Sequence, residues 1–172
     1  MLINNINSAD FLITLLACLN EKIIVFPTDI KKTGRYFDQL IDDYGIHYVY
    51  NGQFQSTDNS EQQPLSIEHD IVLFSSGTTG LPKGIPLQLQ NIHNRILAFQ
   101  KKYSHHAQQA LNFLPTSFGH GLIANTLFPL VTSHQLILCK KFDITVALQL
   151  AQLIDQHKIS YFSSVPSVWN LL

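Results

Sequence analysis

The chain has 172 residues, with 11 Lys and Arg against 12 Asp and Glu, and 45% of its residues are hydrophobic. These values fit one soluble globular domain with enough chain for a buried core, and they exclude collagen, a coiled coil and a disordered tail. No Lys/Arg run exceeds two residues, so no basic surface for nucleic acid is expected. Only 13% of the residues are charged, below the usual quarter or so, which suggests that part of the surface is covered.

The composition near the N-terminus gives no membrane or export signal. The apolar run at residues 11–19 is nine residues long, whereas a membrane span needs about 18 or more. The first basic residue is Lys22, so the basic start of a secretory signal is missing and a cytoplasmic protein is expected. Cys18, Cys139 and the eight histidines lack ligand spacing, so we expect free thiols and no structural metal.

The first third of the chain alternates helix and strand patterns. Ser8 is a suitable cap for a helix over residues 9–20, and residues 22–26 predict a strand closed by Pro27. A second helix is predicted over residues 33–44 and a second strand over 46–50. Residues 51–68 are polar, which predicts a surface connection and a subdomain edge.

The alternation continues to the C-terminus. Strands are predicted at 70–74, 85–89, 110–114, 135–139 and 159–162, and helices at 91–103 capped by Asn91, after Asp143, and after Pro166. The helix after Asp143 is expected to turn inward Ile144, Ala147, Leu148, Ala151 and Ile154. The resulting fold class is α/β, a layered and mostly parallel sheet with flanking helices.

The segment 75–84 is the most informative one. It follows a predicted strand and holds four hydroxyl residues, three glycines and one lysine. Glycines let main-chain N–H groups approach an anion, hydroxyls donate to phosphate oxygens, and a lysine adds a compact positive charge. These residues therefore favour phosphate binding, and a plain turn of small residues between two strands is the alternative.

Two common nucleotide motifs do not fit this segment. Counting from Gly77, a Walker loop needs glycine at Pro82, and it needs Ser or Thr at Gly84 after Lys83. The chain also has no Gly-x-Gly-x-x-Gly sequence.

The segment closely resembles the phosphate loop of the adenylate-forming superfamily, which includes acyl-CoA and aryl-CoA synthetases, luciferases and peptide-synthetase adenylation domains. Ser-Ser-Gly-Thr-Thr-Gly-Leu-Pro-Lys-Gly at 75–84 carries the resemblance, and Leu-Pro-Thr-Ser-Phe-Gly-His-Gly-Leu at 114–122 is similar to the family's next motif. The order of elements after Lys141 is also similar. The likeness runs from about residue 11 to residue 172.

The resemblance implies an enzyme that joins a carboxylate to ATP, releases pyrophosphate, and passes the acyl group to a thiol of CoA or a carrier protein. ATP and Mg²⁺ are the implied cofactors. The implied catalytic residues are Lys83, Thr78 and Thr79. The residues implied to bind the β- and γ-phosphates are Ser75, Ser76, Gly77, Thr78, Thr79, Gly80 and Lys83. Their work would be positioning and charge stabilisation, because pyrophosphate gains negative charge as it leaves.

The second motif implies the carboxylate pocket, with Phe118, His120 and Gly121 as its residues. Many family members have His where this chain has Phe118, which affects the substrate class more than the fold. The alternative is that His120, between two glycines, is an ordinary turn residue. The aromatic and apolar side chains here would favour an apolar acid, or serve as ordinary core: Phe113, Phe118, Leu122 and Ile123.

The resemblance also implies a longer enzyme of about three times this length. On that basis residues 1–172 form a single incomplete AMP-binding domain, part of the large N-terminal region, without the adenine-binding segment, the C-terminal lid and the Glu that holds Mg²⁺. We expect the chain alone to be inactive and to need a complementary chain or a homodimer. Two alternatives stay open: a non-catalytic binding or interaction module, and an independent phosphate-binding protein.

Overall fold

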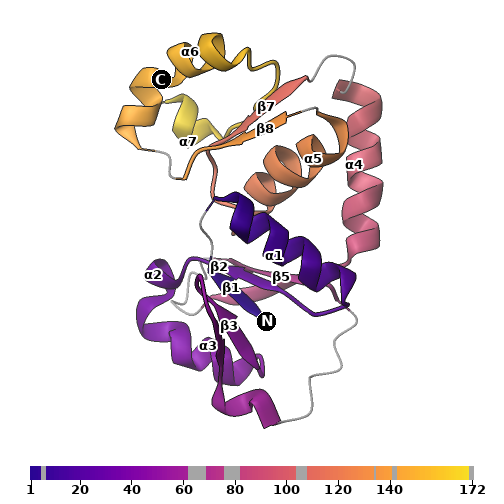
Figure 1. The fold of residues 1–172 in the computed structure, drawn as a ribbon, viewed down its shortest axis with the longest axis vertical. Helices are drawn as coiled ribbons and strands as arrows, with labels where there is room; N and C mark the ends of the chain where they lie inside the picture. The colour runs from indigo at the N-terminus through magenta and orange to yellow at the C-terminus, as the bar shows by residue number, and fades with distance from the viewer. Residues whose placement is uncertain are drawn as a thin grey trace. The chain divides into compact units, whose positions relative to one another are not determined.

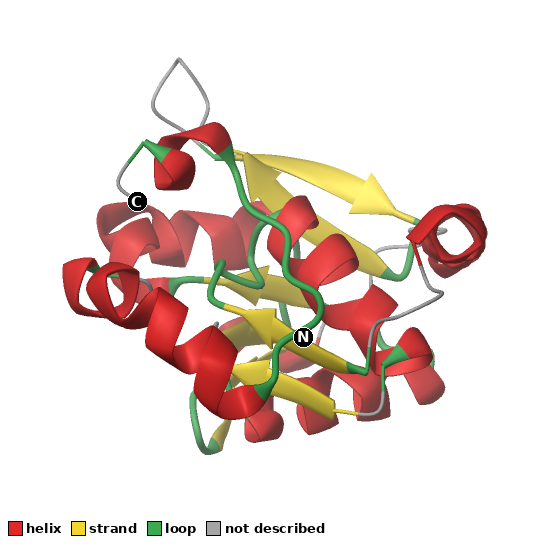
Figure 2. Ribbon diagram, turned by 90° about the horizontal axis from the view of Figure 1, so that it is seen from above, coloured by secondary structure: helices red, strands yellow, loops and turns green. Residues whose placement is uncertain are grey.

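The computed structural model describes residues 1–4, 7–61, 69–75, 82–103, 108–133, 135–140 and 143–170. The chain divides into two compact units, Met1–Asn91 and Ile92–Leu172, and each is described by itself (Figure 1). In each unit, helices pack against strands (Figure 2). The predicted subdomain edge at 51–68 stays a prediction, and residues 62–68 of it lie outside the described residues.

A four-stranded sheet organises the first unit. Its strands are β1 (Leu2–Asn4), β2 (Phe26–Thr28), β3 (Tyr48–Tyr50) and β4 (Phe54–Ser56), in the order β2-β1-β3-β4. The central strand β1 pairs in parallel with β2 and β3, and β3 pairs antiparallel with β4. Sequence patterning missed β1 because three residues are too few to show alternation, and it treated β4 as part of a polar connection.

Pro27 lies inside β2, whereas the sequence predicted a strand ending before it. The N–H of Phe26 points toward β1, where it donates to the Met1 carbonyl. The N–H of Val25 points the other way and donates to Asp70. The main-chain nitrogen of Pro27 faces the same way as that of Val25, away from β1. Proline is tolerated there because its missing N–H removes no hydrogen bond to β1.

The helices of the first unit confirm one prediction and correct another. Helix α1 (Ala9–Asn20) begins after Ser8, whose hydroxyl accepts the Phe11 N–H at 3.2 Å. The single helix predicted over 33–44 is instead α2 (Ile30–Thr33), a 3₁₀ turn η1 (Gly34–Tyr36) and α3 (Phe37–Asp43). Gly34 has φ +40°, a left-handed conformation that interrupts a right-handed helix.

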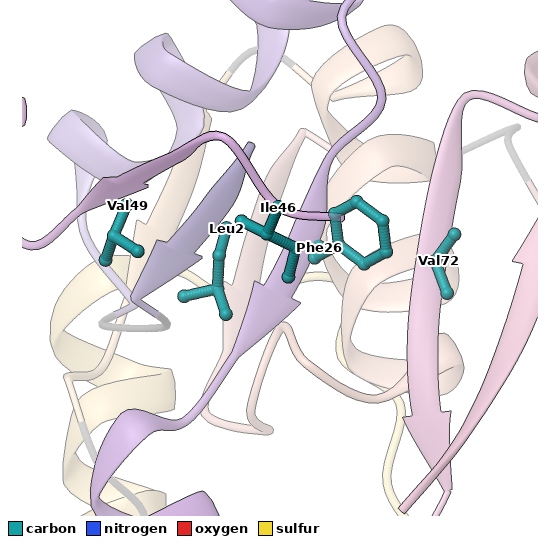
Figure 3. Close-up of a cluster of buried hydrophobic side chains, with 5 residues drawn as sticks. All are labelled: Leu2, Phe26, Ile46, Val49 and Val72. Atoms are coloured by element: carbon teal, nitrogen blue, oxygen red, sulfur yellow. The ribbon is translucent and has the colours of Figure 1, made fainter. Parts of the chain in front are cut away.

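A hydrophobic cluster fills the inside of this unit. Figure 3 shows its five buried side chains, which come from four strands and from the loop before β3: Leu2, Phe26, Ile46, Val49 and Val72. Half-buried Tyr44 and Phe74 extend the cluster. The ring of Tyr44 contacts Phe26 and Phe74 edge to face, at centroid distances of 5.7 and 5.3 Å. The ring of Tyr44 is therefore held on two sides.

Strands β5 (Ile71–Ser75) and β6 (Lys83–Leu87) form an antiparallel hairpin. A single parallel bridge between Val25 and Ile71 joins it to the chain beside β2. The strand predicted at 85–89 begins two residues earlier, because pairing with β5 includes Lys83. Segment 76–82 therefore links two strands that are neighbours in the sheet and run in opposite directions.

Helix α4 (Leu89–Tyr103) contains the division between the units. It begins two residues before the predicted cap, Asn91, so that prediction is wrong. The carboxylate of Asp70 accepts the Leu89 N–H instead. A carboxylate at a helix N-terminus satisfies a free amide and complements the helix dipole, and here it comes from outside the helix. The helical spacing of Ile92, Ile96, Phe99 and Tyr103 predicts one apolar stripe, and burial of Ile92 and Ile96 confirms it at these two positions.

The second unit has two parallel strands, β7 (Gln109–Asn112) and β8 (Gln135–Leu138). Tyr161 adds one parallel bridge to Ala110, where the sequence predicted a strand over 159–162. The other elements are the π-helix η3 (His120–Leu127), α5 (Phe128–Thr132), α6 (Ile144–His157) and α7 (Pro166–Trp169). Among the described residues, no helix is long and apolar enough to cross a bilayer.

Helix α6 begins as predicted, with the Asp143 carboxylate accepting the Val146 N–H at 3.1 Å. Its buried face differs from the prediction. Ala147 and Leu150 are buried, whereas Ile144 and Leu148 are 76% and 81% exposed. Apolar residues occupy more than one side of this helix, so the sequence period alone could not select the packed side.

The fold class is confirmed. Both units are mixed α/β, with parallel strand pairs and packed helices, and the antiparallel pairs are β3–β4 and β5–β6.

Candidate functional site

The β5–β6 hairpin positions two of the predicted phosphate ligands. Ser75 and Lys83 pair directly across the hairpin, so the Cα atoms of these two residues, which flank segment 76–82, lie about 4.5–5.5 Å apart. The Ser75 hydroxyl donates to the Lys83 carbonyl at 3.3 Å, and the side chain of Lys83 is exposed. This geometry places Lys83 at the first position of β6, directly after the Gly- and Thr-rich segment. Ser76, Gly77, Thr78, Thr79 and Gly80 lie outside the described residues.

The residue after Lys83 is held by Tyr44. The Gly84 N–H donates to the Tyr44 hydroxyl oxygen at 2.7 Å. A Cβ at position 84 would lie 2.5 Å from that oxygen and 2.8 Å from two ring carbons, so the close approach requires glycine. No local pattern in the sequence marks Tyr44, since its partner lies 40 residues away.

The predicted pocket residues lie in the second unit, on the turn after β7 and the start of η3. Phe118 is 53% exposed, His120 is exposed and Gly121 is buried. A Cβ on Gly121 would overlap the Pro115 carbonyl oxygen, so glycine is required for packing at this position. Phe113, Leu122 and Ile123 are buried, which makes them core residues. A substrate role for Phe118, His120 and Gly121 stays a prediction.

A buried polar network shapes this segment. Asn112 is fully buried, and its side-chain amide N–H donates to the Thr126 hydroxyl oxygen at 2.8 Å. Its side-chain oxygen accepts the Leu114 N–H at 2.8 Å, and the Thr126 hydroxyl donates to the Gly121 carbonyl at 2.8 Å. Buried polar groups satisfied in this way fix one conformation, because each lost partner would leave an unpaired group.

Proline helps to explain why η3 needs a side-chain partner. A π-helix pairs each N–H with the carbonyl five residues earlier, so the Ala124 carbonyl would face position 129. That position is Pro129, which has no N–H to donate. The Tyr161 hydroxyl donates to the Ala124 carbonyl instead, at 3.0 Å.

His120 faces residues that sequence analysis did not select. Its Nε2 lies 2.8 Å from the Ser163 hydroxyl oxygen. Fully buried Asn125 bonds the Ser163 main chain twice, donating to its carbonyl at 2.6 Å and accepting its N–H at 3.0 Å. We call His120, Asn125 and Ser163 the polar cluster. The serine pair before Val165 was the available signal, but nothing in the sequence linked it to His120.

Among the described residues, neither the two thiols nor the acidic side chains form a further candidate site. Burial raises the pKa of the Cys18 thiol and of the Cys139 thiol, which disfavours the reactive thiolate. Within the described ranges, His, Cys, Asp and Glu side chains form no group of three suited to a metal ion.

The chain is similar to known adenylate-forming proteins. A family model described as AMP-binding enzyme matches residues 49–172. A long-chain-fatty-acid–CoA ligase of Bacillus subtilis is 32% identical over 107 residues, which are 59% of this chain and 19% of the ligase. A dimodular nonribosomal peptide synthase of the same organism is 28% identical over 116 residues, 65% of this chain and 5% of the synthase.

Solved structures give the same fold. The o-succinylbenzoate CoA synthetase of Bacillus subtilis, in complex with its acyl-adenylate intermediate, matches 98% of this chain and 50% of its own, with 18% identity and a TM-score of 0.77. The same enzyme in complex with ATP and magnesium ion matches with a TM-score of 0.74. The chain spans about half the length of these structures. With more than half of its residues matched by the family model, the chain belongs to the AMP-binding enzyme family.

Proposed function

We propose that this chain supplies the phosphate-binding part of an ATP-dependent acyl-adenylate-forming ligase. The reaction joins a carboxylate to ATP, giving acyl-AMP and pyrophosphate, and then moves the acyl group to a thiol of CoA or a carrier protein. The observation that carries the proposal is the register of the β5–β6 hairpin, which sets Lys83 opposite Ser75 at the base of the Gly- and Thr-rich segment. Family membership supports it.

Lys83 has the clearest role in this proposal. A carboxylate oxygen attacks the α-phosphorus of ATP, the bond from phosphorus to the bridging oxygen breaks, and negative charge grows on pyrophosphate. The ammonium of Lys83 would stabilise that charge, together with Thr78 and Thr79. Ser76, Gly77 and Gly80 would add donors or close main-chain approach. The Ser75 hydroxyl proton is engaged by the Lys83 carbonyl, so Ser75 would close the loop more than donate.

ATP and Mg²⁺ are the proposed cofactors. The solved synthetase complex with ATP and magnesium ion supports both, since it shares this fold. When bound, Mg²⁺ would neutralise phosphate charge. Its carboxylate ligand, the adenine and ribose contacts, and the thiol-transfer lid are proposed to come from elements outside residues 1–172.

A second candidate function is a binding or interaction module without catalysis. The exposed apolar side chains of Ile144 and Leu148, one turn apart on α6, favour it. Under this alternative, ATP turnover would be absent even with a complementary polypeptide present.

The test measures ATP binding to the chain by calorimetry, and carboxylate-dependent exchange of pyrophosphate into ATP after adding a polypeptide that holds the remaining adenylation elements. Lys83→Ala is expected to weaken ATP binding and to lower exchange by about 100-fold or more, as for other removed transition-state donors. Lys102→Ala, at an exposed lysine of α4, is the matched control. Equal values for both variants would remove Lys83 from the mechanism, and exchange that never appears would favour the interaction module.

A further inference from the structure

The outer edge of β6, the side that faces away from β5, has one main-chain N–H to satisfy. The Val72 N–H donates to the Val25 carbonyl at 2.9 Å, so this position of β5 faces away from β6. Main-chain groups alternate in direction along an antiparallel pair, so Phe74 faces the same way as Val72, and their partners Gly84 and Pro86 face away from β5. Pro86 has no N–H. Of the five residues of β6, all of them described, Gly84 therefore carries the one N–H at the outer edge.

Tyr44 supplies the acceptor for this N–H. Its hydroxyl oxygen lies 2.7 Å from the Gly84 nitrogen, and within the described part of the chain β6 pairs with no strand other than β5. The Tyr44 ring packs edge to face against Phe26 and Phe74, so the oxygen is held in place by the aromatic contacts. The Tyr44–Gly84 bond thus fixes the outer edge of β6 at the end where segment 76–82 joins it.

Tyr44 acts on Lys83 through the main chain. The N–H that Tyr44 accepts belongs to the peptide group that joins Lys83 to Gly84. Successive side chains of a strand point to opposite faces, and the Tyr44 ring covers the face at position 84. The Lys83 side chain therefore points to the other face, where it is exposed. Tyr44 influences the lysine by fixing the peptide group from which the side chain extends.

A lysine whose main chain is already fixed binds phosphate more tightly than a lysine that must first be ordered. Without the tyrosine oxygen, the peptide group after Lys83 bonds to water in several orientations, and each orientation directs the ammonium differently. A ligand then binds only the fraction of molecules in the competent orientation, and the apparent Kd rises as that fraction falls. One neutral hydrogen bond corresponds to about three- to tenfold in Kd.

We propose that Tyr44 is a positioning residue for the phosphate site: its hydroxyl oxygen fixes the Lys83–Gly84 peptide group and thereby directs the Lys83 ammonium toward the β- and γ-phosphates of ATP. This inference rests on the proposed ligase function and adds a residue to its ATP-binding part. The work of Tyr44 is done before ATP arrives, because the bond already exists in the free chain.

The test titrates ATP and, separately, inorganic pyrophosphate into the full ¹⁵N-labelled chain and follows the main-chain amide signals. Tyr44→Phe keeps the ring and removes the acceptor. This variant is expected to raise the Kd of both ligands by the same factor, about three- to tenfold, since pyrophosphate is the part of ATP that Lys83 is proposed to bind.

Two control variants separate positioning from overall stability. Ile3→Val trims a fully buried side chain of β1 and is expected to lower the unfolding midpoint about as much as Tyr44→Phe. Tyr48→Phe removes a hydroxyl from an exposed tyrosine of β3. Neither control is expected to change either Kd, because a chain that stays folded keeps its binding site whatever its margin of stability.

A double-mutant cycle shows whether the effect passes through Lys83. If Tyr44 acts by directing the ammonium, Tyr44→Phe loses its effect once the ammonium is gone. In a Lys83→Ala background the tyrosine substitution is therefore expected to change the Kd of pyrophosphate by less than about twofold. A purely structural contribution of Tyr44 would lower affinity by the same factor in both backgrounds.

Three results would overturn the inference: a Tyr44→Phe chain that binds both ligands as tightly as the unmodified chain, an equal loss of affinity in Ile3→Val, or an undiminished effect of Tyr44→Phe in the Lys83→Ala background. If Lys83→Ala weakens binding while Tyr44→Phe does not, the positioning role is wrong and the ligase proposal stands. If the unmodified chain binds neither ligand, or Lys83→Ala binds both equally well, the ligase proposal fails and the positioning role fails with it.

Discussion

The hydroxyl oxygen of Tyr44, just after α3, accepts the main-chain N–H of Gly84 in β6 at 2.7 Å. The bond joins a residue of the aromatic cluster to the residue next to Lys83. The main chain at Lys83 is therefore held twice: Lys83 pairs with Ser75 across the hairpin, and the next residue, Gly84, bonds to Tyr44. Tyr44, which lies 40 positions earlier in the sequence, thus helps to hold the start of β6, directly after the proposed phosphate loop.

Tyr44→Phe is expected to destabilise the chain by about 1 kcal/mol, because the ring stays and only the acceptor for the half-buried Gly84 amide is lost. The urea midpoint of unfolding measures this. Tyr48→Phe, at a 48% exposed tyrosine of β3, is the control and should change the midpoint very little. Equal effects of the two substitutions would show that the Tyr44–Gly84 bond adds no stability.

Gly84→Ala is expected to destabilise by about 1–3 kcal/mol, because the new methyl would overlap the Tyr44 ring, and the contacts with Phe26 and Phe74 resist its displacement. A double-mutant cycle checks the cause. In a Tyr44→Ala background the same glycine substitution should cost clearly less. If Gly84→Ala destabilises the Tyr44→Ala chain as much as the unmodified chain, the strain does not come from the Tyr44 ring.

Leu150→Ala and Leu148→Ala form a matched pair on α6. Leu150 is 5% exposed and packs in a core cluster with Leu111 and Phe113, so its truncation is expected to cost about 2–4 kcal/mol. Leu148 is 81% exposed, and its truncation should cost less than about 0.5 kcal/mol. Thermal or urea unfolding distinguishes them, and a reversed order would contradict the α6 packing described above.

The two thiols should titrate at higher pH in the folded chain than in the unfolded chain, because burial raises the pKa of Cys18 and of Cys139 from the ordinary value of 9.0. The iodoacetamide alkylation rate, measured against pH with and without guanidinium, reports the difference. A raised folded-state pKa stabilises below the unfolded pKa and less so above it, so this contribution to stability is expected to fall as pH rises above about 9. The single variants Cys18→Ala and Cys139→Ala assign the two rates, and coincident folded and unfolded curves would refute the shift.

Local patterns in the sequence predicted several elements correctly. Ser8 and Asp143 cap their helices through their own side chains, and such bonds depend on residues only three positions apart. The α/β alternation and the buried positions Ile92 and Ile96 followed from periodicity for the same reason. The resemblance at 75–84 indicated the family without any tertiary information.

The predictions failed where a distant partner decides the local structure. Asp70, not Asn91, accepts the first amide of α4, and β1 becomes a central strand only because β2 and β3 lie on either side of it. The packed side of α6 depends on which apolar residues meet the sheet, so Leu150 is buried and Leu148 is not.

By itself, the sequence determined the α/β class, the helix caps at Ser8 and Asp143, and the family to which the chain belongs, because these depend on neighbouring residues and a contiguous motif. Only the tertiary structure decided that Tyr44 holds Gly84 and that His120 meets Ser163, since those contacts join residues about 40 positions apart. Side chains so far apart leave no period or spacing in the sequence, and only the packed chain brings their hydrogen-bonding groups together.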